Sequence, residues 1–359
     1  MSKFQWDPTQ DQTYKTADGS QTVTTKTIDK LAGKSFTMDA MEQTLELQIQ
    51  PPLDRQFFWA KPPGQVGDTV NIKILQGTFR INGKKEDDVS GPVFYSNEDY
   101  YHSTAISTEG DGRLEFIGFN SINFASFERE GAHSDRSCTI NMSDDSCILI
   151  NNCDIVNILS GLKINNKSSF IIYASMLQMD LGQNVVIAGS PDAAGCSFLF
   201  DSTHSLTGDS KATISSISFK ENSISQIVTK ELEFSDCLIE ENARVFISTD
   251  SYTGYTDSVS LSRGTPELNI SPLNNKYVFD IFGILDGKIK YPEGCFNFIT
   301  SDGENKGTLR LSVSDPGAFG FGVLLDKKII YIDDRPATKA ELIDEYSEMP
   351  GFITVRLTN

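Results

Sequence analysis

Four carboxylates beside short apolar segments are the residues of this chain whose types and spacing could support catalysis. They are Asp154, Asp236, Glu240 and Glu241. Cleavage of a glycosidic bond requires two carboxyl groups about 5 to 9 Å apart, and aligned positions on neighbouring strands would supply that separation. Because the chain has 49 acidic residues, carboxylates near turns are also expected as solvated surface charges. We therefore assign no catalytic residue, and these four are candidates only if the protein is an enzyme.

The remaining reactive side chains form no catalytic or metal-binding motif. A lyase would need bound calcium and a basic residue such as Lys220 or Arg244, but no local spacing demands this chemistry. The three histidines lie in separate loop-like segments, and the six cysteines lack CxxC pairs, so we expect reduced, buried thiols. Residues 317–322 are rich in glycine but lack the Lys-Ser or Lys-Thr of a phosphate loop. We expect no metal and no cofactor.

Aromatic residues in polar or proline-rich surroundings form a second candidate site, which would bind a partner or a sugar. Tyrosine rings stack on sugars and anchor protein interfaces, and a rigid loop between prolines presents its anchors at low entropic cost. The alternative is that these rings cover the ends of the fold or pack on their own β unit. The candidates are Phe57, Phe58, Trp59, Tyr95, Tyr100, Tyr101, Tyr252 and Tyr255.

Short apolar segments recur between Leu114 and Ser248 and predict stacked β-strands. Segments such as Ile148–Ile150 are too short for a freestanding sheet, but parallel stacking at roughly 4.8 Å would bury their inward residues against matching positions above and below. Expected strand starts lie 19 to 28 residues apart, at Leu114, Thr139, Leu162, Val185, Thr213 and Leu232. This spacing favours the turns of a solenoid. The alternative is a β-sandwich, whose strands recur every 8 to 12 residues or so.

Asparagines follow several of these segments, and we expect them at the corners between strands. Asparagine tolerates the left-handed backbone of a sharp turn and can hydrogen-bond to its equivalents along a stack. The residues concerned are Asn151, Asn152, Asn165, Asn166 and Asn222.

Changes in composition along the chain predict an all-β protein in four parts. These are a polar N-terminal arm (1–50), a small β unit (51–105), a parallel β-helix (106–251) and a β-rich C-terminal cap (252–359). Within the cap, Thr338 and Glu341 have the spacing of a capping box, which predicts one short helix over Arg335–Tyr346.

The formal net charge of −18 restricts the partners. Nucleic acids and anionic membranes attract clustered Lys and Arg, and no such cluster occurs, so neither is expected. The first residues lack the apolar core of a secretory signal, and no stretch is apolar enough to cross a bilayer. We therefore expect synthesis and folding in a cytoplasm.

The segment Ala337–Asp344 resembles the Ala-Thr-Lys-x-Tyr-Val-Asp phrase of bacteriophage tail-fibre proteins, with one extra residue before the aspartate and no tyrosine. The repeated region separately resembles right-handed parallel β-helix proteins, which include pectin-lyase-like enzymes and phage tailspikes. Together these resemblances imply a virion component that acts in assembly or host attachment without enzymatic activity. Its partners would be other virion proteins, itself as a trimer, and a surface glycan. The alternatives are a polysaccharide-cleaving β-helix enzyme and a bacterial adhesin or effector.

Overall fold

The computed structural model describes most of the chain, and almost all of its regular structure is β-strand. The described residues are 4–7, 9–25, 34–49, 56–60, 69–84, 91–97, 103–126, 138–159, 161–179, 185–189, 195–203, 210–253, 258–274, 293–312, 321–344 and 352–358. Most strand pairs are parallel, so the expected all-β, parallel-strand class is confirmed. Two compact units are present, one of residues 1–185 with 204–208, the other of residues 186–203 with 209–359.

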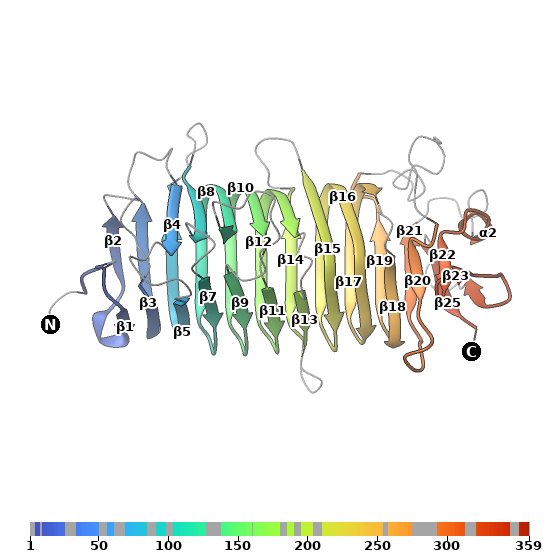
Figure 1. Cartoon of the computed structure of the whole chain (residues 1–359), viewed down its shortest axis with the longest axis horizontal. Helices are drawn as coiled ribbons and strands as arrows, with labels where there is room; N and C mark the ends of the chain where they lie inside the picture. The colour runs from blue at the N-terminus through green and yellow to red at the C-terminus, as the bar shows by residue number, and fades with distance from the viewer. Residues whose placement is uncertain are drawn as a thin grey trace. The chain divides into compact units, whose positions relative to one another are not determined.

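Unit 1 is a succession of parallel strands whose inward residues lie in register (Figure 1). One core column runs through Leu45, Phe79, Leu114, Ile148 and Phe170, and each of these side chains is fully buried. Stacking of equivalent apolar positions therefore builds the core. The elements are β1 (Gln12–Lys15), η1 (Thr16–Asp18), β2 (Gln21–Thr25), β3 (Phe36–Ile49), β4 (Gln56–Ala60), β5 (Thr69–Asn82), β6 (Val93–Asn97), β7 (Ser103–Thr108), β8 (Arg113–Ser126), β9 (Cys138–Met142), β10 (Cys147–Ile158), β11 (Gly161–Asn165) and β12 (Ser169–Met179). Strand β13 (Val185–Ala188) falls at the division between the units.

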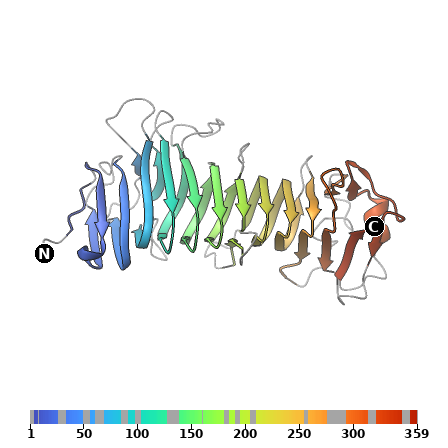
Figure 2. The same ribbon diagram turned by 90° about the horizontal axis from the view of Figure 1, so that it is seen from below.

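Unit 2 repeats this construction and ends in antiparallel strands. Its core column runs through Phe200, Ile227, Ile247, Ile270 and Leu311, all buried. Strand β25 then pairs antiparallel with both β21 and β24, in the part drawn in red in Figure 2. The elements are β14 (Ser197–Asp201), β15 (Lys211–Lys220), β16 (Ile224–Glu241), β17 (Arg244–Thr253), β18 (Val259–Gly264), β19 (Glu267–Ser271), β20 (Phe296–Phe298), β21 (Thr308–Ser312), α2 (Phe321–Asp326), β22 (Ile330–Ile332), β23 (Arg335–Pro336), β24 (Leu342–Asp344) and β25 (Phe352–Leu357).

The corners between strands use left-handed backbone at matching positions. Gly110, Asp144 and Asn166 have φ of 58°, 61° and 56° and each follows a register-matched strand position by two residues. Asn152 is also left-handed, with φ of 53°. The expectation for Asn152 and Asn166 is therefore confirmed. After β15, however, the left-handed residue is Glu221 and not its neighbour Asn222.

The N-terminal region differs from the expected polar arm. Within residues 1–50, strands β1 and β2 both pair in parallel with β3. Strand β3 pairs in turn with β5, across the expected boundary at residue 50. The physical reason is a period of two in β3, where Phe36, Met38 and Ala40 are buried. A strand needs an apolar residue only at every second position to bury one face. The mostly polar composition of residues 1–50 therefore did not indicate that β3 was there.

The predicted helix over Arg335–Tyr346 is wrong. Strand β23, a turn and strand β24 occupy the described part of this segment, up to Asp344, and the one described α-helix is α2. The capping-box residues do meet, because Thr338 donates to Glu341 from its backbone nitrogen (3.0 Å) and its hydroxyl (2.7 Å). The Arg335 guanidinium also donates hydrogen bonds to both oxygens of the same carboxylate, at 2.5 and 3.1 Å. The Thr338–Glu341 spacing, which predicted a helix start, therefore stabilises a turn in this segment.

Candidate functional site

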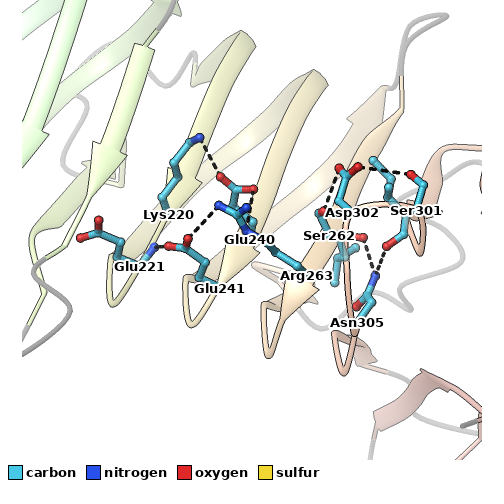
Figure 3. Close-up of polar contacts among 11 residues, drawn as sticks. Lys220, Glu221, Glu240, Glu241, Ser262, Arg263, Ser301, Asp302 and Asn305 are labelled. Atoms are coloured by element: carbon cyan, nitrogen blue, oxygen red, sulfur yellow. Dashed lines mark hydrogen bonds and ion pairs between the residues drawn. The ribbon is translucent and has the colours of Figure 1, made fainter.

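A row of charged residues lies where strands β15, β16 and β18 of unit 2 end side by side (Figure 3). Phe219 is in register with Ile239, and Ile239 is in register with Leu261. The residues that follow these three positions therefore become neighbours. They are Lys220, Glu221, Glu240, Glu241, Ser262 and Arg263, which we call the strand-end row.

Glu240 is the most enclosed carboxylate of the strand-end row. Its side chain is 8% exposed, and its Oε1 lies 2.7 Å from Lys220 Nζ, in a contact whose angles are not those of a hydrogen bond. Its Oε2 lies 3.8 Å from Arg263 Nε. A buried carboxylate is costly without opposite charge nearby, and the two cations on adjacent strands supply that charge.

Arg263 and Glu241 extend the row of ion pairs. Arg263 Nη2 donates to Glu241 Oε1 at 3.0 Å, so this guanidinium contacts both carboxylates of the strand end. Glu241 Oε2 also accepts a hydrogen bond of 2.9 Å from the backbone nitrogen of Glu221. Gly264 is in register with Glu241 at a φ of 87°, and a Cβ there would lie 2.7 Å from the Glu241 backbone. Only glycine permits this close approach.

Glu221 differs from its neighbours because no cation contacts it in a described ion pair. Both Glu221 and Glu241 are left-handed, with φ of 54° and 62°, and they occupy stacked positions on adjacent strands. Burial raises the pKa of Glu221, the negative charge of Glu241 raises it further, and Lys220 partly opposes this shift. Like charges on stacked positions favour the neutral form of one of them.

A polar turn closes the other side of the row. Ser262 is fully buried and donates to Asp302 Oδ2 at 3.4 Å. Asn305 donates to the carbonyl oxygens of Leu261 (2.8 Å) and Ile299 (2.9 Å), which fastens the turn to the end of β18 (Figure 3).

The four predicted carboxylates do not converge as one catalytic set. Glu240 and Glu241 lie together in the strand-end row, where they form the ion pairs described above. Asp236 is exposed earlier in β16 and accepts a hydrogen bond of 2.6 Å from Ser216, its register neighbour. Asp154 lies in β10 of unit 1, half-buried, and has an interaction of its own. The structure therefore brings together only the adjacent pair.

The predicted aromatic binding residues that are described lie mainly in the core, which corrects their assignment to an exposed surface. Phe57 is fully buried and stacks on Phe94 with ring centroids 5.5 Å apart, and Trp59 is 4% exposed. Tyr252 is 2% exposed and donates from its hydroxyl to the Phe234 carbonyl at 3.1 Å. Because these three side chains are buried, they fill the interior and form no exposed surface. Tyr95 is half-buried; the Phe58 side chain, Tyr100, Tyr101 and Tyr255 lie outside the described residues.

The cysteines are free, as expected, and five of the six are buried. Burial raises the pKa of Cys196 and of Cys295 to about 12, so both thiols stay protonated at neutral pH. Within the described ranges, no group of three His, Cys, Asp or Glu side chains could hold a metal ion. Among the same residues, no helix has the length and apolar composition needed to span a bilayer.

Sequence reasoning missed Arg263, the cation that joins the two glutamates. A search for opposite charges one strand repeat apart would have found Lys220 and Glu240, and Arg263 at the next repeat. No family model, curated protein or solved structure matches this chain. A functional assignment therefore rests on its own side chains.

Proposed function

We propose that this chain is a non-enzymatic structural component of a virion, a bacteriophage tail-fibre, spike or baseplate protein acting in assembly or host attachment. We further propose that the parallel strands of each unit wind as a right-handed β-helix. The observation that carries the functional proposal is the engagement of Glu240 and Glu241 by Lys220 and Arg263 on neighbouring strands.

The partners of these carboxylates support a structural role over a catalytic one. A general acid or nucleophile must reach a substrate from a site that admits one. Glu240 instead has an 8% exposed side chain between two cations. Side-chain hydrogen bonds also join successive repeats elsewhere in unit 2, between Asn242 and Asn222 (3.2 Å) and between Asn274 and Asp250 (2.6 Å). Such contacts tie one strand to the next.

The pairing supports the proposed solenoid. In unit 2, β16 pairs with β15 on one side and with β17 on the other, in parallel throughout. Parallel neighbours in one sheet require crossover connections, and such connections are right-handed in nearly all known cases. The virion setting rests on the tail-fibre resemblance of residues 337–344 and on the acidic charge, which disfavours nucleic acid and anionic lipid.

Two measurements test this function. Purified protein should release no new reducing ends from pectin or bacterial capsular polysaccharide. In particles purified from a lysate of the organism that encodes it, the chain should co-sediment in a fixed ratio to the other virion proteins. Cleavage that disappears in a folded Glu240→Gln variant, or absence from the particles, would contradict the proposal.

A polysaccharide-cleaving enzyme is the second candidate, and the Glu221–Glu241 pair is the observation that favours it. A carboxyl whose pKa is raised by burial and by the negative charge of a neighbouring carboxylate is a feature of general acids in glycosidases. In that case, Glu221→Gln would abolish cleavage of the substrate and leave the fold intact.

A further inference from the structure

We propose that a row of four side chains in unit 2, which we call the outer row, binds a sugar acid, that is, a sugar bearing a carboxylate. The row crosses four strands that pair in succession, β17, β19, β21 and β25 (Figure 1). Its members are in register with one another and are Phe246, Asn269, Arg310 and Thr354. The inference goes beyond the proposed function, because it assigns a ligand class and the residues that bind it.

The outer row lies on the face of the sheet that points away from the core. Neighbours along a strand point to opposite faces, and the residues on either side of each member are buried and apolar. These neighbours are Val245, Ile247, Leu268, Ile270, Leu309, Leu311, Ile353 and Val355. Phe246 is 38% exposed, so its ring is accessible to a ligand.

Arg310 has an unoccupied pair of donors. Its side chain is 19% exposed, and its Nη1 atom donates to Glu267 Oε2 (3.1 Å) and to Asn269 Oδ1 (3.4 Å). In the described part of the chain, neither Nε nor Nη2 of Arg310 makes a hydrogen bond. These two nitrogens form one edge of the guanidinium, and such an edge binds a carboxylate through two parallel hydrogen bonds. One nitrogen therefore holds the arginine in place, and the edge that suits a carboxylate stays open.

Two polar groups beside Arg310 have no partner. Asn269 Nδ2 and Thr354 Oγ1 are shielded from solvent and make no hydrogen bond within the described residues. Thr354 is 1% exposed and lies directly opposite Arg310 across the β21–β25 pair. A buried polar group without a partner is unfavourable, and a ligand hydroxyl would supply the missing hydrogen bond. Arg310 lies between the two groups in the row, so a ligand that draws its guanidinium outward comes within reach of both.

This combination of groups favours a sugar acid over a peptide or a neutral sugar. Strands β19 and β21 are paired on both sides, so the row offers a ligand its side chains and no free backbone groups. A peptide on this face would leave most of its backbone amides unpaired, whereas sugar hydroxyls pair with side-chain donors. The Phe246 ring can stack on the apolar C–H face of a sugar. The open edge of Arg310 calls for a carboxylate on that sugar.

The carboxylates nearest the outer row permit a small anion despite the net charge of −18. At physiological salt, charges interact over roughly 8 Å, so the local groups decide. In the segments that pair across the row, the one carboxylate is Glu267, which Arg310 neutralises. Asp250 and Asp344 lie beyond those segments, and each has an interaction of its own. Arg244 is exposed on β17 and adds a cation that has no ion pair among the described residues.

Ligand-detected NMR and titration calorimetry on the full chain test the site with two acidic probes, trigalacturonate and sialyllactose. Their neutral counterparts are methyl-esterified trigalacturonate and lactose. We expect at least one acidic probe to bind, with an affinity that falls as salt is added, and its neutral counterpart to bind far more weakly. Absence of binding by both acidic probes overturns the proposal, as does equal binding of the neutral counterpart.

Arg310→Lys keeps the charge and removes the two-nitrogen edge, so it should weaken binding of the acidic probe roughly tenfold or more. The matched control is Arg80→Lys in unit 1. The Nε atom of Arg80 already donates to Glu115 at 2.7 Å, and this variant should bind as wild type does. Equal losses in the two variants would contradict the assignment of the site to Arg310.

Thr354→Val separates ligand binding from stability. The variant keeps the shape of the side chain and removes an unpartnered buried hydroxyl, so it should raise the thermal midpoint of the free protein and still weaken binding of the probe. A lower midpoint, or unchanged binding, would contradict the role of Thr354. Probes that fail to bind leave the co-sedimentation test of the proposed function unaffected. Cleavage of a probe, or absence of the chain from virions, would overturn the proposed function and leave the sugar-acid site standing.

Discussion

Glu240 shows how a side chain of a catalytic type can serve the fold. Its carboxylate is largely buried, and the lysine and arginine that approach it come from the strands on either side. Removal of one partner from a buried charge pair leaves the other uncompensated. The residue therefore ties three strands together, and its role follows from its neighbours.

Tyr252 is expected to stabilise the core of unit 2 instead of binding a ligand. Its hydroxyl has a buried acceptor in the Phe234 carbonyl. Tyr252→Phe should lower the free energy of unfolding by about 1 kcal/mol, because that carbonyl loses its hydrogen bond in an apolar setting. Chemical denaturation followed by circular dichroism measures the change. Tyr331→Phe is the control, since its hydroxyl contacts Glu293 at the surface and should change stability by no more than about 0.5 kcal/mol. A Tyr252→Phe variant as stable as the control would contradict this role.

Glu221 is expected to reduce stability at neutral pH. Its pKa is raised in the folded state, so ionisation is harder there than in the unfolded chain. The folded state consequently loses stability as the pH rises from about 4.5 through the raised pKa. Glu221→Gln should raise the thermal midpoint at pH 7 and leave it unchanged at pH 3. Glu231→Gln, at an exposed position of β16, controls for net charge. Equal effects of both variants at pH 7 would argue against repulsion within the row.

At the level of elements, the sequence predicted the strands better than their ends. The six expected starts, at Leu114, Thr139, Leu162, Val185, Thr213 and Leu232, all lie within strands, because alternating burial leaves a period-two pattern. The capping-box spacing of Thr338 and Glu341 was misleading. Its hydrogen bonds satisfy a tight turn as well as a helix start, and Arg335, outside the motif, also donates to Glu341 in this turn.

The turn between β23 and β24 should depend on the charge of Glu341. Hydrogen bonds from Arg335 and Thr338 lower the pKa of Glu341 to about 2. A lowered carboxyl pKa adds stability that is present above the unfolded value near 4.5 and is lost as the pH falls through about 2. Glu341→Gln should therefore lower the thermal midpoint at pH 6, and its difference from wild type should shrink between pH 4.5 and pH 2. A difference that stays constant over this range would show that the charge contributes nothing.

For the whole molecule, the strand-end row was only partly readable from the sequence. Glu240 and Glu241 stood out as carboxylates after an apolar segment, but their cations lie about one strand repeat before and after them. The burial of Phe57 and Trp59 was not predicted from the sequence, because the prolines around them indicated a loop. Both the ion pairs of the row and the burial of these two rings depend on the register between strands that are far apart in the sequence. That register cannot be read from the sequence when the loops between strands differ in length.

The free energy of unfolding of Glu240→Gln tests the central claim, that this carboxylate stabilises the fold. The amide cannot neutralise Lys220 and Arg263, so stability should fall by about 1 to 3 kcal/mol. The matched control is Glu304→Gln, which breaks an exposed pair with Lys306 and should cost less than about 1 kcal/mol. Unfolding should be followed by circular dichroism and not by tryptophan fluorescence, because both tryptophans lie in unit 1 and Glu240 lies in unit 2. Catalytic residues are commonly held at a cost to stability, so a Glu240→Gln variant as stable as wild type, or more stable, would contradict the structural account.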